Sequence, residues 1–178
     1  MGDSAKILEN LIPQLQAWWD PITYIGYFTG LVMVVSGVIS AIPKNQSMHR
    51  GGEYGKSFAL VISGSLLLSL IPFMDVLSQT IFLEDSVHGL SYTPPSSDTP
   101  EGVYITVGML IIMLTGLVGV IRGLNLLGKS GGDSRLFAPA VTHLIGGIAA
   151  VNFTKLLGVI GVSLGGDIEN ILSKIVGS

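Results

Sequence analysis

The chain contains no cysteine and few charged residues. Without cysteine, its 178 residues hold no disulfide framework, no thiolate metal site and no cysteine nucleophile. Charged residues make up 12 %, about half of the usual share in soluble domains. The net charge of −3 provides no basic surface for nucleic acid, and the 48 % of hydrophobic residues argues against disorder. The composition therefore indicates an integral membrane protein rather than a soluble enzyme.

Four stretches are long enough to cross a bilayer, which takes about 20 mostly apolar residues. The predicted spans are about 22–42, 58–74, 103–121 and 138–165. Polar residues interrupt the fourth stretch, so either of its halves can define the hydrocarbon portion. The predicted fold is a single all-α membrane domain, residues 1–178, with four transmembrane helices arranged as two tandem hairpins.

An amphipathic segment precedes the first span, within residues 1–21. Its tryptophans favour a helix lying in the membrane interface, and the alternative is a helix packed against protein. No basic region precedes the first apolar run, so no signal peptide is expected. The apolar side chains at helical spacing are Ile7, Leu8, Leu11, Ile12, Leu15, Trp18 and Trp19.

The distribution of lysine and arginine predicts the orientation. The loops 43–57 and 122–137 carry three basic residues each, whereas the Pro/Ser-rich loop 84–102 carries four acidic residues and no basic one. Because basic loops stay cytoplasmic, we expect loop 84–102 and both termini on the external side.

The two hairpins share a topology and a few identities at offsets of 79–80 residues, for example Phe73 with Phe153. Such a tandem repeat predicts that Asp75 and Lys155 occupy equivalent places near the external ends of the second and fourth spans. There they can form an ion pair. The alternative is that each side chain reaches the interface separately.

Small residues recur on one face of three spans. Such residues let helix backbones approach closely in lipid, so the faces predict tight packing within the chain or between copies. Because four helices have limited interior to use all of these faces, we expect a homo-oligomer. The alternative is that glycine is simply common in membrane helices. The glycines expected at helix contacts are Gly26, Gly30, Gly37, Gly108, Gly119, Gly147, Gly158, Gly161 and Gly165.

Two polar residues of the fourth span are candidates for contacts inside the membrane. His143 shares the glycine face and is interpreted as a packed or interfacial residue, with a proton relay as the alternative. Asn152 is expected to hydrogen-bond a neighbouring helix. No second histidine or carboxylate stands at ligand spacing beside His143, and no catalytic arrangement is visible. The sequence therefore predicts no catalytic residue, no metal site and no cofactor.

Residues 123–130 formally match the phosphate-binding pattern G-x-x-x-x-G-K-[ST]. That pattern functions only after a buried strand and within an α/β domain, where backbone N–H groups surround the phosphates. A membrane span precedes it here. We therefore interpret Lys129 as a cytoplasmic anchor and expect no nucleotide.

One segment resembles a known family. Residues 143–152 (HLIGGIAAVN), after the glycine-rich stretch 128–132, resemble small polytopic inner-membrane proteins of type IVB secretion systems. These are the IcmC/DotE-like proteins of the Dot/Icm machine and the TraQ-like proteins of IncI-type conjugation. The resemblance covers about residues 122–165. It implies a bacterial inner-membrane protein with a periplasmic external side, a structural role beside other secretion-system subunits, and no catalytic residues.

The leading functional prediction is a multimeric structural component that helps form the channel or base of such an apparatus. A small oligomeric channel or transporter is the first alternative. A pilin-like filament subunit is the second, because conjugative pilins are short two-span proteins with a basic cytoplasmic turn. The expected partners are the lipid bilayer, further copies of the chain and other secretion-system subunits, without direct nucleic acid binding.

Overall fold

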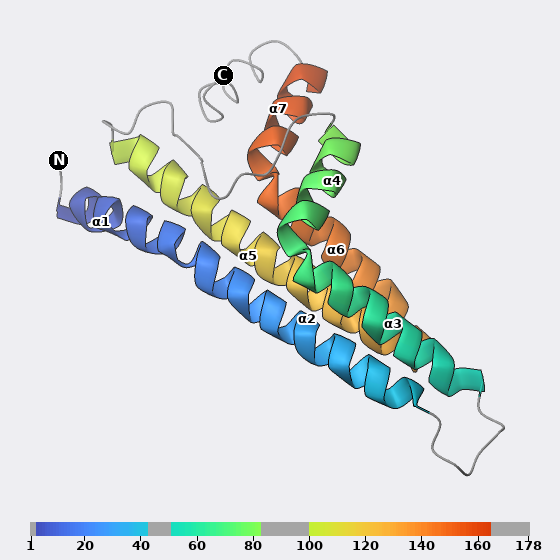
Figure 1. Ribbon diagram of the computed structural model, residues 1–178. Helices are drawn as coiled ribbons and strands as arrows, with labels where there is room; N and C mark the ends of the chain where they lie inside the picture. Colours follow the sequence, from blue (N-terminus) through green and yellow to red (C-terminus); the bar gives the residue numbers. More distant parts are fainter. Residues whose placement is uncertain (1–2, 43–50, 83–99, 165–178) are drawn as a thin grey trace.

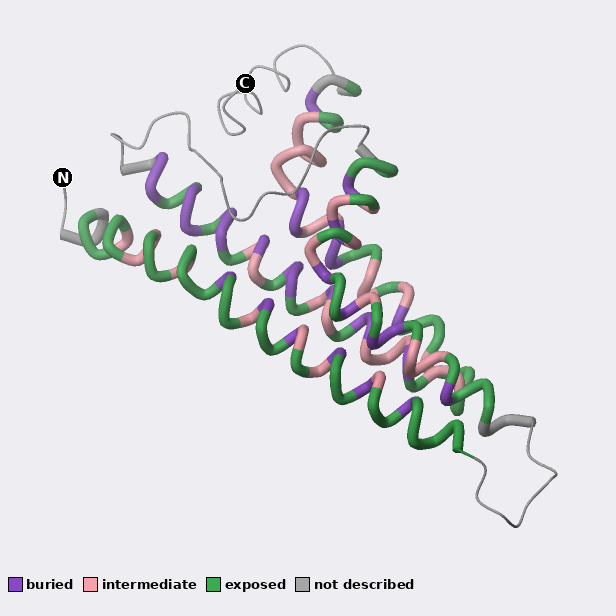
Figure 2. The backbone as a smooth tube through the Cα atoms, in the orientation of Figure 1, coloured by how far each residue is buried: buried purple, intermediate pink, exposed green. Residues whose placement is uncertain are grey.

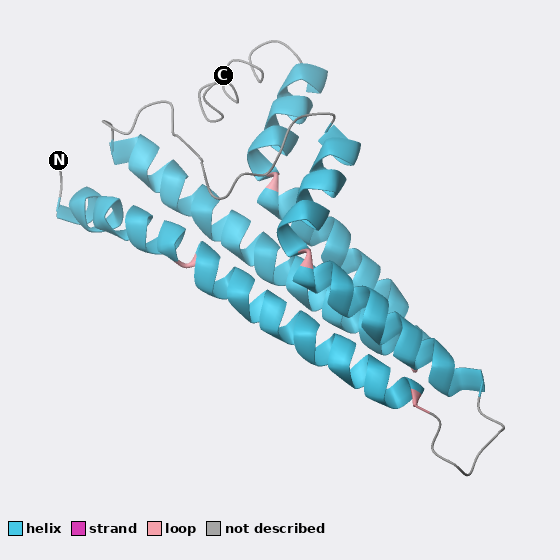
Figure 3. Cartoon of the chain, in the orientation of Figure 1, coloured by secondary structure: helices cyan, strands magenta, loops and turns pink. Residues whose placement is uncertain are grey.

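A computed structural model describes residues 3–42, 51–82 and 100–164. Within these ranges the chain is helical and no strand is present, which confirms the all-α prediction (Figure 3). Figure 1 shows the arrangement of the helices. The helices are α1 (Asp3–Ala17), α2 (Trp19–Ala41), α3 (Gly51–Leu68), α4 (Leu70–Phe82), α5 (Pro100–Ser130), the 3-10 helix η1 (Ser134–Leu136), α6 (Phe137–Val151) and α7 (Phe153–Leu164).

The long helix α5 is the centre of the bundle. It packs against α6 and α3, while α2 packs against α3 and α1 packs against α5 (Figure 1). Leu110, Leu117 and Leu124 are fully buried along α5. Their spacing of seven residues is about two helical turns, so they share one face toward the neighbouring helices. This face supplies much of the hydrophobic core.

Three helical segments are long and apolar enough to cross a membrane: Lys6–Ala41, Gly102–Ser130 and Ser134–Val151. A bent pair, Tyr54–Leu68 with Leu70–Ile81, passes the same test only when its halves are combined. These helices indicate a multi-pass membrane protein. The outer side of α2 is almost wholly apolar, and Figure 2 shows it as largely exposed. Its exposed large side chains are Tyr24, Ile25, Phe28, Leu31, Val32, Val35, Val38 and Ile39.

The predicted second span, 58–74, is not one straight helix. The helix is interrupted at Ser69, and its two halves are bent by 87°. Pro72 explains this break because it has no N–H for the carbonyl of Leu68, four residues earlier, and its ring clashes with that carbonyl. Hydropathy does not predict this bend, since both halves of the helix pair are apolar.

The predicted fourth span, 138–165, is interrupted at Asn152, between α6 and α7. The backbone N–H and the side-chain amide of Asn152 both donate to the carbonyl oxygen of Ile148, at 3.0 Å each. A side chain that bonds to its own helix in this way competes with the regular ladder and favours a bend.

The predicted loop 122–137 is largely helical. Helix α5 continues to Ser130, so Arg122 and Lys129 lie on this helix, and η1 follows after a short turn. Asp133 caps η1 by accepting a hydrogen bond from the backbone N–H of Arg135 at 3.0 Å. Likewise, α3 begins at Gly51, inside the predicted loop 43–57. Most of loop 84–102 lies outside the described residues.

The predicted amphipathic segment forms α1. Ile12 and Leu15 pack against the core cluster, whereas Ile7 and Trp18 are exposed. Because α1 contacts α5, one of its faces lies on protein and the opposite face is free for lipid or another subunit.

Candidate functional site

The candidate site is the set of contacts that joins the helices, and glycine makes the closest of them. A Cβ atom placed on Gly30 of α2 would lie 2.7 Å from Leu67 Cβ and 2.8 Å from the carbonyl oxygen of Gly64. A Cβ atom on Gly64 would lie 2.7 Å from the carbonyl oxygen of Gly30. The backbones of α2 and α3 therefore touch where only glycine fits on either side.

Helices α5 and α6 meet in the same manner. A Cβ atom on Gly116 would lie 2.7 Å from the carbonyl oxygen of Gly147, and one on Gly147 would lie 2.7 Å from that of Gly116. Gly119 contributes more loosely, with 3.3 Å to Gly147 Cα. The half-buried His143 lies one turn earlier on α6, with its carbonyl oxygen 3.6 Å from a Cβ atom at Gly119.

The segment that matches the phosphate-binding pattern lies at the contact of α5 with α2 and α3. A Cβ atom on Gly128 would clash with the methyl group of Met33 of α2 and lie 3.3 Å from Ser63 Cβ of α3. Just after the segment, a Cβ atom on Gly131 would lie 2.5 Å from the carbonyl oxygen of Gly55. On α5, a Cβ atom on Gly123 would lie 2.7 Å from Leu144 Cγ of α6. Residues 123–130 are thus the last turns of α5, where their glycines serve helix contacts rather than a phosphate loop.

Several glycines predicted at helix contacts lie there. A Cβ atom on Gly26 would lie 3.1 Å from Ile121, and one on Gly37 would lie 2.8 Å from Val61. Gly26, Gly30 and Gly37 thus lie at contacts of α2, and Gly147 lies at the contact of α6 with α5.

Other predicted glycines lie elsewhere. In the described part of the chain, no atom of a neighbouring side chain or helix lies within 4 Å of a Cβ atom placed on Gly108 or Gly158. Gly108 is exposed on the side of α5 away from its buried leucines, and Gly158 follows the break at Asn152, so it does not continue the glycine face of α6. Gly161 is buried on α7, and Gly165 lies outside the described residues.

Sequence reasoning missed Gly64 and Gly116. Gly64 lies in the second span, for which no small-residue face is predicted from the sequence. Gly116 is adjacent to Thr115, whose helical spacing from Gly108 and Gly119 predicts the contact face but which is exposed in the structure.

The two helix breaks stand in a common register. Helix α3 is 18 residues long, and Ser134–Val151 is also 18 residues long. Gly64 and Gly147 each lie five residues before their break, at Ser69 and Asn152. From residue 69 to residue 152 the offset is 83, about one helical turn more than the offset of the sequence identities. The two breaks therefore correspond at a different offset from the one that the identities favour.

A buried hydrogen bond ties α4 to the second break. The Ser78 hydroxyl donates to Asn152 Oδ1 at 2.7 Å, and both residues are buried. The interhelical bond expected of Asn152 is thus made to α4. Because Asn152 also bonds to Ile148 in its own helix, its amide holds the break and the neighbouring helix together.

Asp75 and Lys155 are both half-buried, on α4 and α7, and neither is without an interaction partner. Asp75 is six residues past Ser69 and Lys155 three past Asn152, so the two do not occupy equivalent places in the register of the breaks. The ion pair between them stays a prediction.

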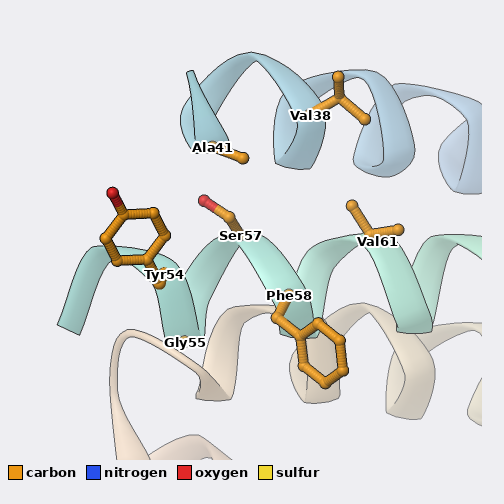
Figure 4. A pocket seen from close by; sticks show the side chains of 7 residues that line it. All are labelled: Val38, Ala41, Tyr54, Gly55, Ser57, Phe58 and Val61. Atoms are coloured by element: carbon orange, nitrogen blue, oxygen red, sulfur yellow. The ribbon is translucent and has the colours of Figure 1, made fainter. Parts of the chain in front are cut away.

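An apolar groove lies between the end of α2 and the beginning of α3. Figure 4 shows Val38 and Ala41 above the α3 side chains, with the Tyr54 hydroxyl at the rim. Its remaining lining residues are Gly55, Ser57, Phe58 and Val61. Such a surface can accept an apolar chain, and among its lining residues Tyr54 and Ser57 carry hydroxyl groups.

Polar chemistry is scarce in the described part of the chain. Over residues 3–42, 51–82 and 100–164, no group of three or more His, Asp or Glu residues is placed to hold a metal ion. The Ser63 hydroxyl is buried near Gly128, and no described residue forms a hydrogen bond with it. The contacts described above therefore join helices to one another.

The chain matches no known family model, no curated protein and no solved structure.

Proposed function

We propose that the protein is a structural, multi-pass component of the inner membrane in a type IVB secretion or conjugative transfer apparatus, present in several copies. One observation carries the proposal. The segment that resembles this family, residues 143–152, is the part of α6 whose Gly147 packs backbone to backbone on Gly116. The segment that carries the resemblance thus includes a close helix–helix contact, and such contacts are what a structural membrane subunit needs.

The proposed topology has two hairpins and four spans, with the hairpin turns on the cytoplasmic side. In Figure 1 the end of α2, the beginning of α3 and the junction of α5 with α6 lie at the same end of the bundle. Gly131 packs against Gly55 at this end, and Lys56, Lys129 and Arg135 are exposed there. The positive-inside rule then assigns loop 84–102 and both termini to the periplasm.

The experiment that tests this proposal is affinity purification from native membranes in mild detergent, with mass spectrometry of the co-eluting proteins. We expect a secretion ATPase, lipoproteins and periplasmic channel proteins to co-elute. A Gly147→Leu variant should insert into the membrane but lose these partners, whereas Gly146→Leu should keep them because a Cβ atom at Gly146 meets nothing within 4 Å. Recovery of the wild-type chain alone would contradict the proposal.

A small oligomeric channel or transporter is the second candidate, and the paired helix breaks favour it. Discontinuous helices in corresponding positions of two halves are typical of transporter binding sites. Under this alternative, proteoliposomes show a proton- or solute-dependent flux that the His143→Ala variant abolishes. Liposomes that remain tight with the wild-type protein would eliminate this candidate.

A further inference from the structure

One side of α5 is exposed from Tyr104 to Arg122 and has the periodicity of a helix–helix interface. Over this stretch its residues follow alternating steps of four and three, the a and d positions of a heptad repeat that lets two helices pack side by side, and Lys129 follows after a further step of seven. No helix among the described residues covers this face, which we call the α5 seam. It consists of Tyr104, Gly108, Ile111, Thr115, Val118, Arg122 and Lys129, all of them exposed.

The helix contacts place Arg122 deep within the apolar part of the bundle. Its neighbours in sequence, Ile121 and Gly123, contact Gly26 of α2 and Leu144 of α6. Leu144 is close to the middle of the apolar segment Ser134–Val151. Arg122 also lies nine residues, about 13 Å, before Gly131, which packs against the beginning of α3. This distance is about half of the roughly 30 Å thickness of a hydrocarbon core.

A lone guanidinium at this depth on a lipid-facing surface is costly, because the hydrocarbon region offers it no water and no opposite charge. Lys129, two turns nearer the turn end, can reach the interface with its long side chain, whereas Arg122 has much farther to reach. Arg122 forms no ion pair with any residue of the described ranges. An intramembrane charge of this kind normally faces another protein helix that supplies an opposite charge.

We propose that the α5 seam docks a transmembrane helix of another subunit, and that this helix carries an aspartate or glutamate that pairs with Arg122. Gly108 and Thr115 then let the partner backbone approach, and Ile111 and Val118 pack between the two helices. A second copy of the chain joined by its own α5 seam does not fit, because in a parallel pair two Arg122 side chains would face each other at like positions. This proposal rests on the proposed function as a subunit of a membrane complex, and it describes the kind of partner helix that such a subunit contacts.

The test is photocrosslinking in native membranes from a single benzoylphenylalanine residue. Val118 of the α5 seam is replaced in one variant, and Val32 on the outer side of α2 in the control. These two valines are exposed to almost the same extent, 49 % and 48 %. We expect Val118 to give a defined adduct whose cross-linked peptide lies in a transmembrane helix with an acidic residue, and Val32 to give none. Arg122→Leu should abolish the adduct, and Arg122→Lys should preserve it.

Three results would overturn the proposal: an adduct between two copies of the chain, an adduct with a helix that lacks Asp and Glu, or equal behaviour at Val118 and Val32. Its failure is distinguishable from that of the proposed function. A captured membrane protein with an intramembrane carboxylate, but with no place in a secretion apparatus, would support the α5 seam and contradict the proposed function.

Discussion

Replacing Gly147 with alanine tests the glycine contact between α5 and α6 with the smallest possible change. The added Cβ atom would lie 2.7 Å from the carbonyl oxygen of Gly116 and 2.7 Å from the backbone nitrogen of Val120. Carbon contacts are comfortable at about 3.5–4.0 Å, so the helices must separate. Overpacking of this kind costs about 1–3 kcal/mol of the free energy of unfolding.

Gly146→Ala is the matched control for this prediction. It adds the same methyl group one residue earlier on α6, where nothing lies within 4 Å. Both variants gain about 1 kcal/mol of helix propensity, so this gain cancels in the comparison. The assay is unfolding of the purified protein in detergent, followed by the fluorescence of Trp18 and Trp19. Equal unfolding free energies for the two variants would refute the backbone contact.

Three further predictions concern α3, α4 and the second break. Ser78→Ala should lower the unfolding free energy by about 0.6–1.7 kcal/mol by removing the bond to Asn152. Ser65→Ala should lower it less, because that exposed hydroxyl bonds only within its own helix; equal effects would contradict the role of the Ser78 bond. Pro72→Ala should restore the missing N–H and reduce the 87° bend; an unchanged distance between spin labels on α3 and α4 would contradict this cause. Ser63→Ala should leave stability unchanged or raise it, because no described residue forms a hydrogen bond with the buried hydroxyl; a clear loss in the same unfolding assay would contradict this.

The helical class and the apolar helices α2 and α5 were predictable because long uncharged stretches leave few alternatives in a membrane. The breaks were not predicted, since hydropathy averages over a window and assigns the same value to a straight and to a bent segment. The signal for the first break was nevertheless present in Pro72. Asn152 gave no such signal, because its effect depends on whether its side chain bonds to its own helix or to another.

The glycine contacts were predictable only in part. A face of small residues shows that some helix can approach, but it does not show which one or whether it belongs to the same chain. Gly108 illustrates this limit, because it lies on an exposed side of α5 whereas Gly116, eight residues later, lies at the contact with α6. The depth of Arg122 was equally hidden, since it depends on how far α5 is shifted along α2 and α6.

The mass and composition of the native assembly test the central claim, that this chain is a structural subunit of a larger membrane machine. We would extract the protein from its own membrane in mild detergent and measure the complex by native mass spectrometry. The account predicts several copies of the chain within one large particle, together with other inner-membrane and periplasmic subunits. A free monomer or a small complex of this chain alone would contradict it.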